Sequence, residues 1–99
     1  MLDIKVTTNG DSAVIKLIGR LDTNTTSQLE SEMKHLYSMK EIVFDLEELD
    51  YISSSGLRIL LITKKVIDNT KLIKVSEYVM SIFEATGFDT IMDIERNES

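Results

Sequence analysis

The sequence predicts an α/β domain in which a mixed sheet of four to five strands is flanked by helices. Strand-like runs alternate with stretches of helical spacing after an initial hairpin, which is typical of a mixed sheet with helices packed on it. The chain has 99 residues, of which 42% are hydrophobic, and it contains no proline. This length supports one hydrophobic core but not two. We therefore expect a single domain over residues 1–99, with a polar, frayed tail at 95–99.

The first elements form a predicted antiparallel hairpin. Residues 2–8 and 13–18 are rich in β-branched side chains, and Asn9-Gly10-Asp11 lies between them. Asn-Gly favours a tight turn because both residues tolerate positive φ. Gly19-Arg20-Leu21-Asp22 then closes the hairpin.

A helix is predicted over residues 25–38. Thr25 and Gln28 have the spacing of a capping box, in which each side chain serves a free backbone N–H of the first turn. Apolar residues recur at helical spacing, which predicts one buried face. They are Leu29, Met33, Leu36 and Tyr37.

The second half of the chain continues the alternation of strands and helices. Gly87 is the expected stop of its last helix. We predict strands over 41–46, 72–75 and 91–94, and helices over 57–68 and 77–86.

Composition excludes several classes of partner. The chain carries 17 acidic and 11 basic residues, a formal net charge of -6, and its basic residues are scattered. Nucleic acid repels such a chain. Cysteine is absent, which removes disulfides and fits a reducing compartment. The N-terminus lacks a secretory pattern, and no run approaches the ~18 apolar residues of a membrane span. We expect a cytoplasmic protein with no membrane partner.

Enzyme signatures are missing. No Gly-x-Ser-x-Gly elbow and no glycine-rich phosphate loop occurs. The single histidine, His35, is expected on the solvated side of the first helix. Glu47, Glu48 and Asp50 are interpreted as a solvated loop, and no His or Cys joins them, so neither a metal site nor a cofactor is predicted. The chain is therefore expected to bind rather than to catalyse.

The segment Ser53-Ser54-Ser55-Gly56 is the most informative one, because three hydroxyls stand at the start of a predicted helix. Serine is a favoured N-cap, and capping accounts for one of the three. The functional interpretation is that one serine accepts a phosphoryl group, since a helix N-terminus favours an anion. Phosphorylation would add roughly -1.5 to -2 charges there. Both interpretations stay open.

The helix over 57–68 has two apolar faces. One is the natural core face, formed by Leu57, Leu60, Leu61 and Ile67. The other carries Ile59, Ile62 and Val66, in line with Ser55. Because a surface helix needs only one apolar face, the second stripe either packs under another helix or docks a partner protein. In the docking hypothesis, phosphate on Ser55 spoils the contact.

Four segments together resemble the STAS domain, and most of all the bacterial anti-sigma factor antagonists. They are Gly19-Arg20-Leu21-Asp22, the strand Ile42 to Leu46, the run from Asp50 to Leu57, and Phe83-Glu84-Ala85-Thr86-Gly87-Phe88. The resemblance covers about residues 2–94. It implies a mixed sheet flanked by helices and a partner-switching function.

In that function, the unphosphorylated antagonist binds an anti-sigma factor, which then releases a sigma factor. The anti-sigma factor is a serine kinase that phosphorylates the serine before the glycine, here Ser55, and a serine phosphatase reverses the step. The resemblance places Asp22 near the phosphoacceptor. The family commonly has Asp two residues before the phosphoacceptor, where this chain has Ser53, so Ser54 or Ser53 are competing acceptors. The partner-binding residues are then Asp22, Ser54, Ser55, Gly56, Ile59, Ile62 and Val66.

Two other functions stay open. The first is a scaffold or accessory subunit of STAS type that is not phosphorylated, in a stress-signalling or transport complex. The second is a sensor that binds a nucleotide near Asp22 and Ser55. Mass change after incubation with a kinase and ATP separates the switch from the scaffold, and nucleotide titration tests the sensor.

Overall fold

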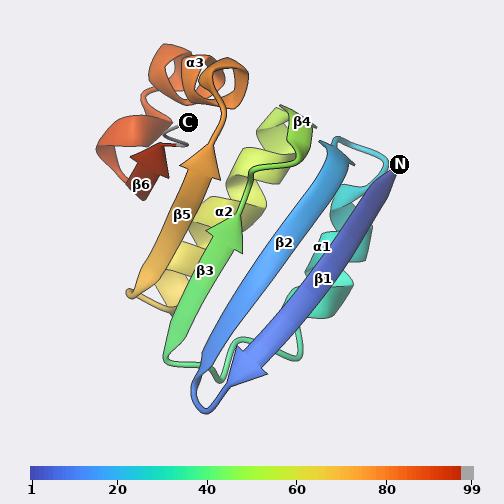
Figure 1. The fold of residues 1–99 in the computed structure, drawn as a ribbon, viewed down its shortest axis with the longest axis vertical. Helices are drawn as coiled ribbons and strands as arrows, with labels where there is room; N and C mark the ends of the chain where they lie inside the picture. Colours follow the sequence, from blue (N-terminus) through green and yellow to red (C-terminus); the bar gives the residue numbers. More distant parts are fainter. Residues whose placement is uncertain (97–99) are drawn as a thin grey trace.

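A computed structural model describes residues 1–96, which form a six-stranded sheet with helices packed on it (Figure 1). The mixed α/β class is confirmed, with one strand more than predicted. The strands are β1 (Leu2–Asn9), β2 (Ser12–Leu21), β3 (Glu41–Asp45), β4 (Leu49–Ile52), β5 (Thr70–Val75) and β6 (Asp93–Arg96). The helices are α1 (Thr26–Met33), α2 (Ser54–Val66), α3 (Glu77–Thr86) and the short 3₁₀ helix η1 (Phe88–Thr90).

The sheet has the strand order β1-β2-β3-β5-β6, with β4 beside β2. β1 runs antiparallel to β2, and the other pairs are parallel. β2 is long enough to pair with β3 over Ser12–Lys16 and then with β4 over Gly19–Leu21. The carboxyl ends of β2, β4 and β5 thus lie at one edge of the sheet, and α1, α2 and α3 begin from that edge.

One face of the sheet is covered by helices. Figure 1 shows α1 behind β1 and β2, and α2 behind β3 and β5. Alternate strand residues point to this side and are buried, as the period of two in a strand requires. The largest fully buried side chains include Ile15, Leu17, Leu21, Leu29, Met33, Phe44, Leu60, Leu72 and Phe83.

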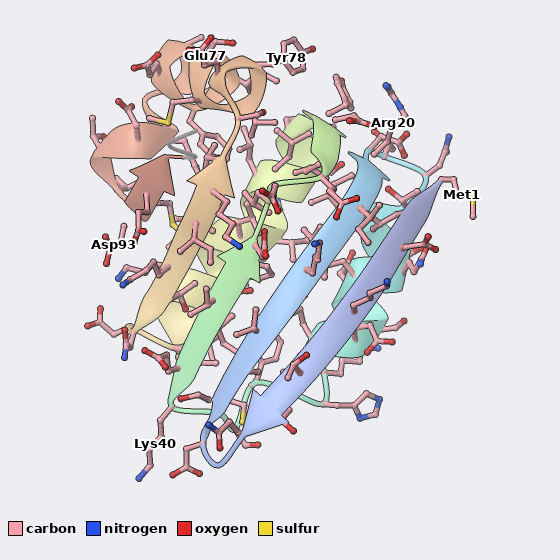
Figure 2. The ribbon with its side chains drawn as sticks, in the orientation of Figure 1. Met1, Arg20, Lys40, Glu77, Tyr78 and Asp93 are labelled. Carbon is pink, nitrogen blue, oxygen red and sulfur yellow. The ribbon has the colours of Figure 1, made fainter. Side chains whose placement is uncertain are left out.

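Gly19 lets the start of the chain pass close to β2. Its φ is +107°, and a Cβ there would lie 2.4 Å from the carbonyl oxygen of Met1. Only glycine tolerates both conditions. The next residue, Arg20, donates its backbone N–H to the Met1 carbonyl oxygen at 3.0 Å. Figure 2 shows Arg20 and Met1 close together at one end of the sheet, with Lys40 at the other end. The segment 19–22 therefore belongs largely to β2 and does not close the hairpin as predicted.

The first helix is shorter than predicted. α1 ends at Met33, and residues 34–38 continue as turns held by i→i+3 hydrogen bonds, such as Leu36 N–H to the Met33 carbonyl at 2.9 Å. Leu36 still faces the core because such turns keep nearly the same periodicity. The predicted capping box is wrong. Thr25 makes no side-chain cap, and the Gln28 amide donates to the Leu2 carbonyl at 2.7 Å.

Other differences lie at element boundaries. Leu49–Ile52 is a strand, so Asp50 belongs to β4 and not to a loop. α2 covers Ser54–Val66, where 57–68 was predicted. The last strand is Asp93–Arg96, so residues 95 and 96 of the expected frayed tail are ordered in β6, and 97–99 lie outside the described residues. The hairpin, α3 and its left-handed cap at Gly87 are confirmed.

Candidate functional site

The three serines take three different roles in the first turn of α2. Ser53 is the N-cap, and its hydroxyl oxygen accepts a hydrogen bond from the backbone N–H of Gly56 at 3.3 Å. Ser55 is half-buried, and its Oγ lies 2.8 Å from the Oγ of Ser53. Ser54 is exposed. Capping thus accounts for Ser53. Of the other two hydroxyls, only that of Ser55 lies within hydrogen-bond distance of the Ser53 cap oxygen.

Gly56 anchors this turn against the sheet. It is buried, and a Cβ at this position would lie 2.9 Å from Ile52 Cγ1 and 2.9 Å from Leu21 Cγ. The backbone N–H of Ser53 donates to the Leu21 carbonyl at 2.9 Å, which ties the cap to the end of β2. The glycine is therefore required by close packing, and it fixes where Ser55 sits.

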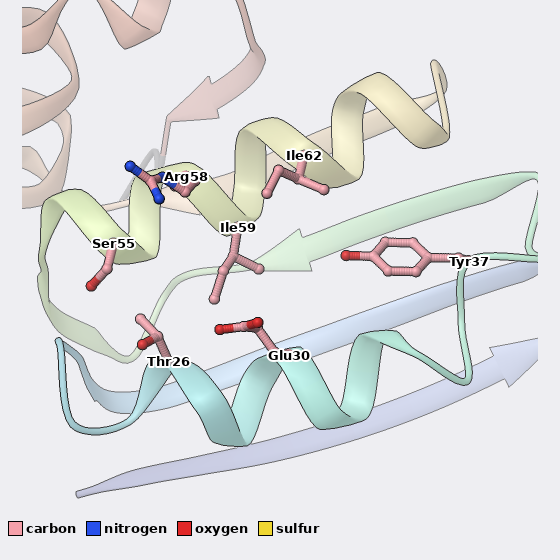
Figure 3. A pocket seen from close by; sticks show the side chains of 7 residues that line it. All are labelled: Thr26, Glu30, Tyr37, Ser55, Arg58, Ile59 and Ile62. Atoms are coloured by element: carbon pink, nitrogen blue, oxygen red, sulfur yellow. The ribbon is translucent and has the colours of Figure 1, made fainter.

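A pocket of about 400 Å³ lies between α1 and α2, beside the serine turn (Figure 3). Ser55 lies at one end of it and Tyr37 at the other, with Ile59 between them. Hydroxyl, carboxylate and guanidinium groups ring this apolar centre. The lining residues are Thr26, Glu30, Tyr37, Ser55, Arg58, Ile59 and Ile62.

The second apolar stripe of α2 is only partly free. Ile59 is 5% exposed, so it packs within the domain and offers no free surface to a partner. It is covered because α1 packs against α2 at this level, and Figure 3 shows Ile59 directed toward α1. Ile62 and Val66 are 42% and 54% exposed. The packing alternative therefore holds for Ile59, whereas docking of a partner on Ile62 and Val66 stays a prediction.

Asp22 organises the turn between β2 and α1. Its Oδ1 accepts hydrogen bonds from the backbone N–H groups of Asn24 at 3.0 Å and Thr25 at 3.1 Å. Partial burial acts to raise the pKa of Asp22, but these hydrogen bonds, the Thr25 hydroxyl and the Arg20 charge outweigh it and lower the pKa. Asp22 does not line the pocket that Ser55 lines.

Sequence reasoning missed four residues of the pocket: Thr26, Glu30, Tyr37 and Arg58. The position of Arg58 beside Ser55 could have been predicted from the sequence, because residues three apart on a helix share a face and Arg58 follows Ser55 by three. The approach of Thr26 and Glu30 to α2 could not, because it depends on how α1 packs against α2. His35 is exposed, as predicted.

Within 1–96, no cluster of three or more His, Asp or Glu side chains is arranged to hold a metal ion. None of the helices in this range combines the length and apolar character needed to cross a membrane.

Comparisons of the sequence with known proteins identify regulatory relatives. The chain is 33% identical, over 84 residues, to BtrV of Bordetella bronchiseptica, which carries the provisional name of anti-sigma factor antagonist; the match covers 79% of this chain and 72% of that protein. It is 29% identical over 99 residues to the anti-sigma-B factor antagonist of Staphylococcus aureus, covering 94% of this chain and 92% of the relative.

Solved structures share the fold. An anti-sigma factor antagonist from Mycobacterium paratuberculosis matches with a TM-score of 0.87 at 19% identity, over 96% of this chain and 86% of that one. The Bacillus cell fate determinant SpoIIAA in its phosphorylated form matches with a TM-score of 0.70 at 20% identity, over 95% and 90% of the two chains. The family model of the STAS domain matches residues 3–99. The chain belongs to the STAS domain family.

Proposed function

We propose that this chain is an anti-sigma factor antagonist, a cytoplasmic binding protein without catalytic activity that is switched off by phosphorylation of Ser55. One observation carries the proposal: the Ser55 hydroxyl lies at the start of a helix whose next turns expose Ile62 and Val66. The names of the relatives in Bordetella and Staphylococcus support it.

The anti-sigma factor binds what we call the α2 docking surface, formed by Ser54, Ser55, Ile62 and Val66. Ile59 lies beneath this surface and supports it from the core. Gly56 contributes by setting the depth of the first turn, and Asp22 by fixing the neighbouring turn that a kinase also contacts. These roles cover all the residues that the sequence assigned to partner binding.

The bound anti-sigma factor acts as a serine kinase. The Ser55 oxygen attacks the γ-phosphorus of ATP, a bond forms between that oxygen and phosphorus, the bond to the bridging oxygen breaks, and ADP leaves. The hydroxyl proton is released to a base of the kinase. A serine phosphatase restores the hydroxyl by hydrolysis and releases inorganic phosphate. Ser55 is favoured over Ser53, whose oxygen already caps the helix.

The phosphate opposes docking by charge and by desolvation. It adds roughly -1.5 to -2 charges next to apolar side chains that a partner would cover. A hundredfold loss of affinity requires only about 2.7 kcal/mol. The helix N-terminus meanwhile tolerates the anion, so the domain stays folded while the contact is lost.

The test uses the serine-kinase anti-sigma factor from the same genome, with ATP and intact-mass measurement. We expect the mass of one phosphate on the parent chain and on Ser54→Ala, and none on Ser55→Ala. Ile62→Asp should weaken kinase binding at least tenfold. Val14→Asp is the matched control, because Val14 is 39% exposed and lies on the sheet face away from the helices.

Two outcomes would contradict the proposal. An unchanged mass of the parent chain, with kinase binding intact, would instead indicate a scaffold of STAS type, a role that Ser53 in place of the family's Asp also allows. Equal weakening by Ile62→Asp and Val14→Asp would show that the partner does not dock on α2.

A further inference from the structure

Arg58 lies one helical turn beyond Ser55 and lines the same pocket. Side chains three positions apart on a helix are neighbours, and each leans toward the helix N-terminus. The guanidinium of Arg58 is therefore directed back along α2 toward the turn that holds Ser55. Figure 3 shows both side chains near the start of α2, with the Ser55 hydroxyl directed toward Thr26 and the Arg58 guanidinium farther from α1.

The lining of this pocket carries few charges. Among the lining residues that the structure describes, Arg58 is the one cation and Glu30 the one carboxylate. Arg58 is exposed, and within residues 1–96 it forms no ion pair. An exposed arginine without a partner keeps its five N–H donors available for an anion.

We propose that Arg58 is the intramolecular counter-ion of phosphorylated Ser55. The inference rests on the proposed phosphorylation and adds how the chain itself reads the phosphate. A planar guanidinium matches phosphate oxygens in a two-point contact, whereas Glu30 on α1 repels them. The phosphate is thus held on the α2 side of the pocket, by Arg58 and by the free N–H groups of the first turn.

Pairing of the phosphate on Ser55 with Arg58 changes the docking surface in two ways. Phosphorylation adds negative charge at Ser55 and also engages Arg58, which forms no ion pair with the residues that the structure describes in the unmodified chain. A partner that contacts Arg58 through a carboxylate or a carbonyl loses that contact as well. The switch is then a rearrangement of charge on α2 and does not require α2 to move.

The test needs no kinase, because phosphoserine is incorporated at position 55 during translation and its second pKa, ordinarily near 6, is followed by ³¹P NMR. We expect Arg58→Gln to raise this pKa by about half a unit, as an exposed ion pair would. Glu30→Gln should lower it. Lys65→Gln is the matched control, since it removes the same charge roughly 15 Å from Ser55 along α2, beyond the screening length of about 10 Å.

The counter-ion assignment is overturned if Arg58→Gln and Lys65→Gln shift the phosphoserine pKa equally, or if neither does. Thermal unfolding gives a second readout: Arg58→Gln should lower the Tm of the phosphorylated chain more than that of the unmodified chain. A failure of the proposed function gives a result that differs from a failure of the counter-ion assignment. A phosphorylated chain that still binds the anti-sigma factor, but shows the shift with Arg58→Gln, refutes the switch and keeps the counter-ion.

Discussion

Replacing Gly56 by alanine should destabilise the fold and disturb the presentation of Ser55. The new methyl group would lie 2.9 Å from Ile52 Cγ1, 2.9 Å from Leu21 Cγ and 3.0 Å from Leu21 Cδ2. Both neighbours are buried strand residues with little room to retreat. Overpacking of this kind costs about 1–3 kcal/mol, and the better helix propensity of alanine returns up to about 1 kcal/mol. We expect a net loss of roughly 1–2 kcal/mol.

Thermal and urea unfolding measure this loss directly. For a domain of this size, a change of 1 kcal/mol shifts Tm by roughly 4–8 °C, so Gly56→Ala should lower Tm by about 5–15 °C. Ser54→Ala is the matched control, because it changes the same turn at an exposed position. Leu21→Ala removes the opposing atoms. The double variant should therefore be more stable than the sum of the two single losses predicts.

An unchanged or raised Tm of Gly56→Ala would refute the reasoning, because the gain in helix propensity would then equal or outweigh the cost of overpacking against Leu21 and Ile52. Additive losses in the double variant would also refute it, since they would show that Leu21 is not the obstacle. A kinase assay on the same variant adds information about function. Slower phosphorylation of Ser55 at temperatures where the variant is folded would indicate that the depth of the turn matters for recognition.

Two further predictions concern the caps around the site. Ser53→Ala removes the N-cap of α2 and should cost about 1 kcal/mol in urea unfolding, whereas a loss no larger than that of Ser54→Ala would contradict the capping role. Asp22→Asn tests the lowered pKa of Asp22. A carboxylate with a depressed folded pKa stabilises the fold above its ordinary pKa of about 3.9 and loses this effect as pH falls. The difference in unfolding free energy between the parent chain and Asp22→Asn should thus shrink between about pH 5 and 3; a difference independent of pH would be inconsistent with it.

The sequence was sufficient for the elements that carry strong local signals. The hairpin followed from its turn and β-branched strands, and α3 followed from its apolar spacing and terminal glycine. The end of α1 could not be predicted, because Leu36 keeps helical spacing in a turn that is not α-helical. β4 was missed because its four residues pair only with the far end of β2, a register that arises from the length of β2.

Residues of the site that share one face of α2 could be predicted from the sequence, but their contacts with other parts of the chain could not. The alignment of Ser55 with Ile62 and Val66 follows from helical periodicity alone. The burial of Ile59 depends on how closely α1 packs against α2, and this distance cannot be predicted from the sequence of α2. The same holds for Glu30, which joins the pocket from α1, and for Tyr37, which joins it from the turns after α1.

The resemblance to the antagonists implies an aspartate at position 53, where this chain has Ser53, and the surroundings of Ser53 give this difference a physical meaning. A carboxylate at position 53 would cap α2 equally well, since Asp and Ser are comparable N-caps. It would also place a negative charge beside the Ser55 oxygen, which lies 2.8 Å from that of Ser53. Neutral Ser53 removes this repulsion and leaves Arg58 as the nearest charge on α2. If Ser55 is phosphorylated as proposed, a neutral residue at position 53 therefore stabilises the phosphorylated state relative to a carboxylate there.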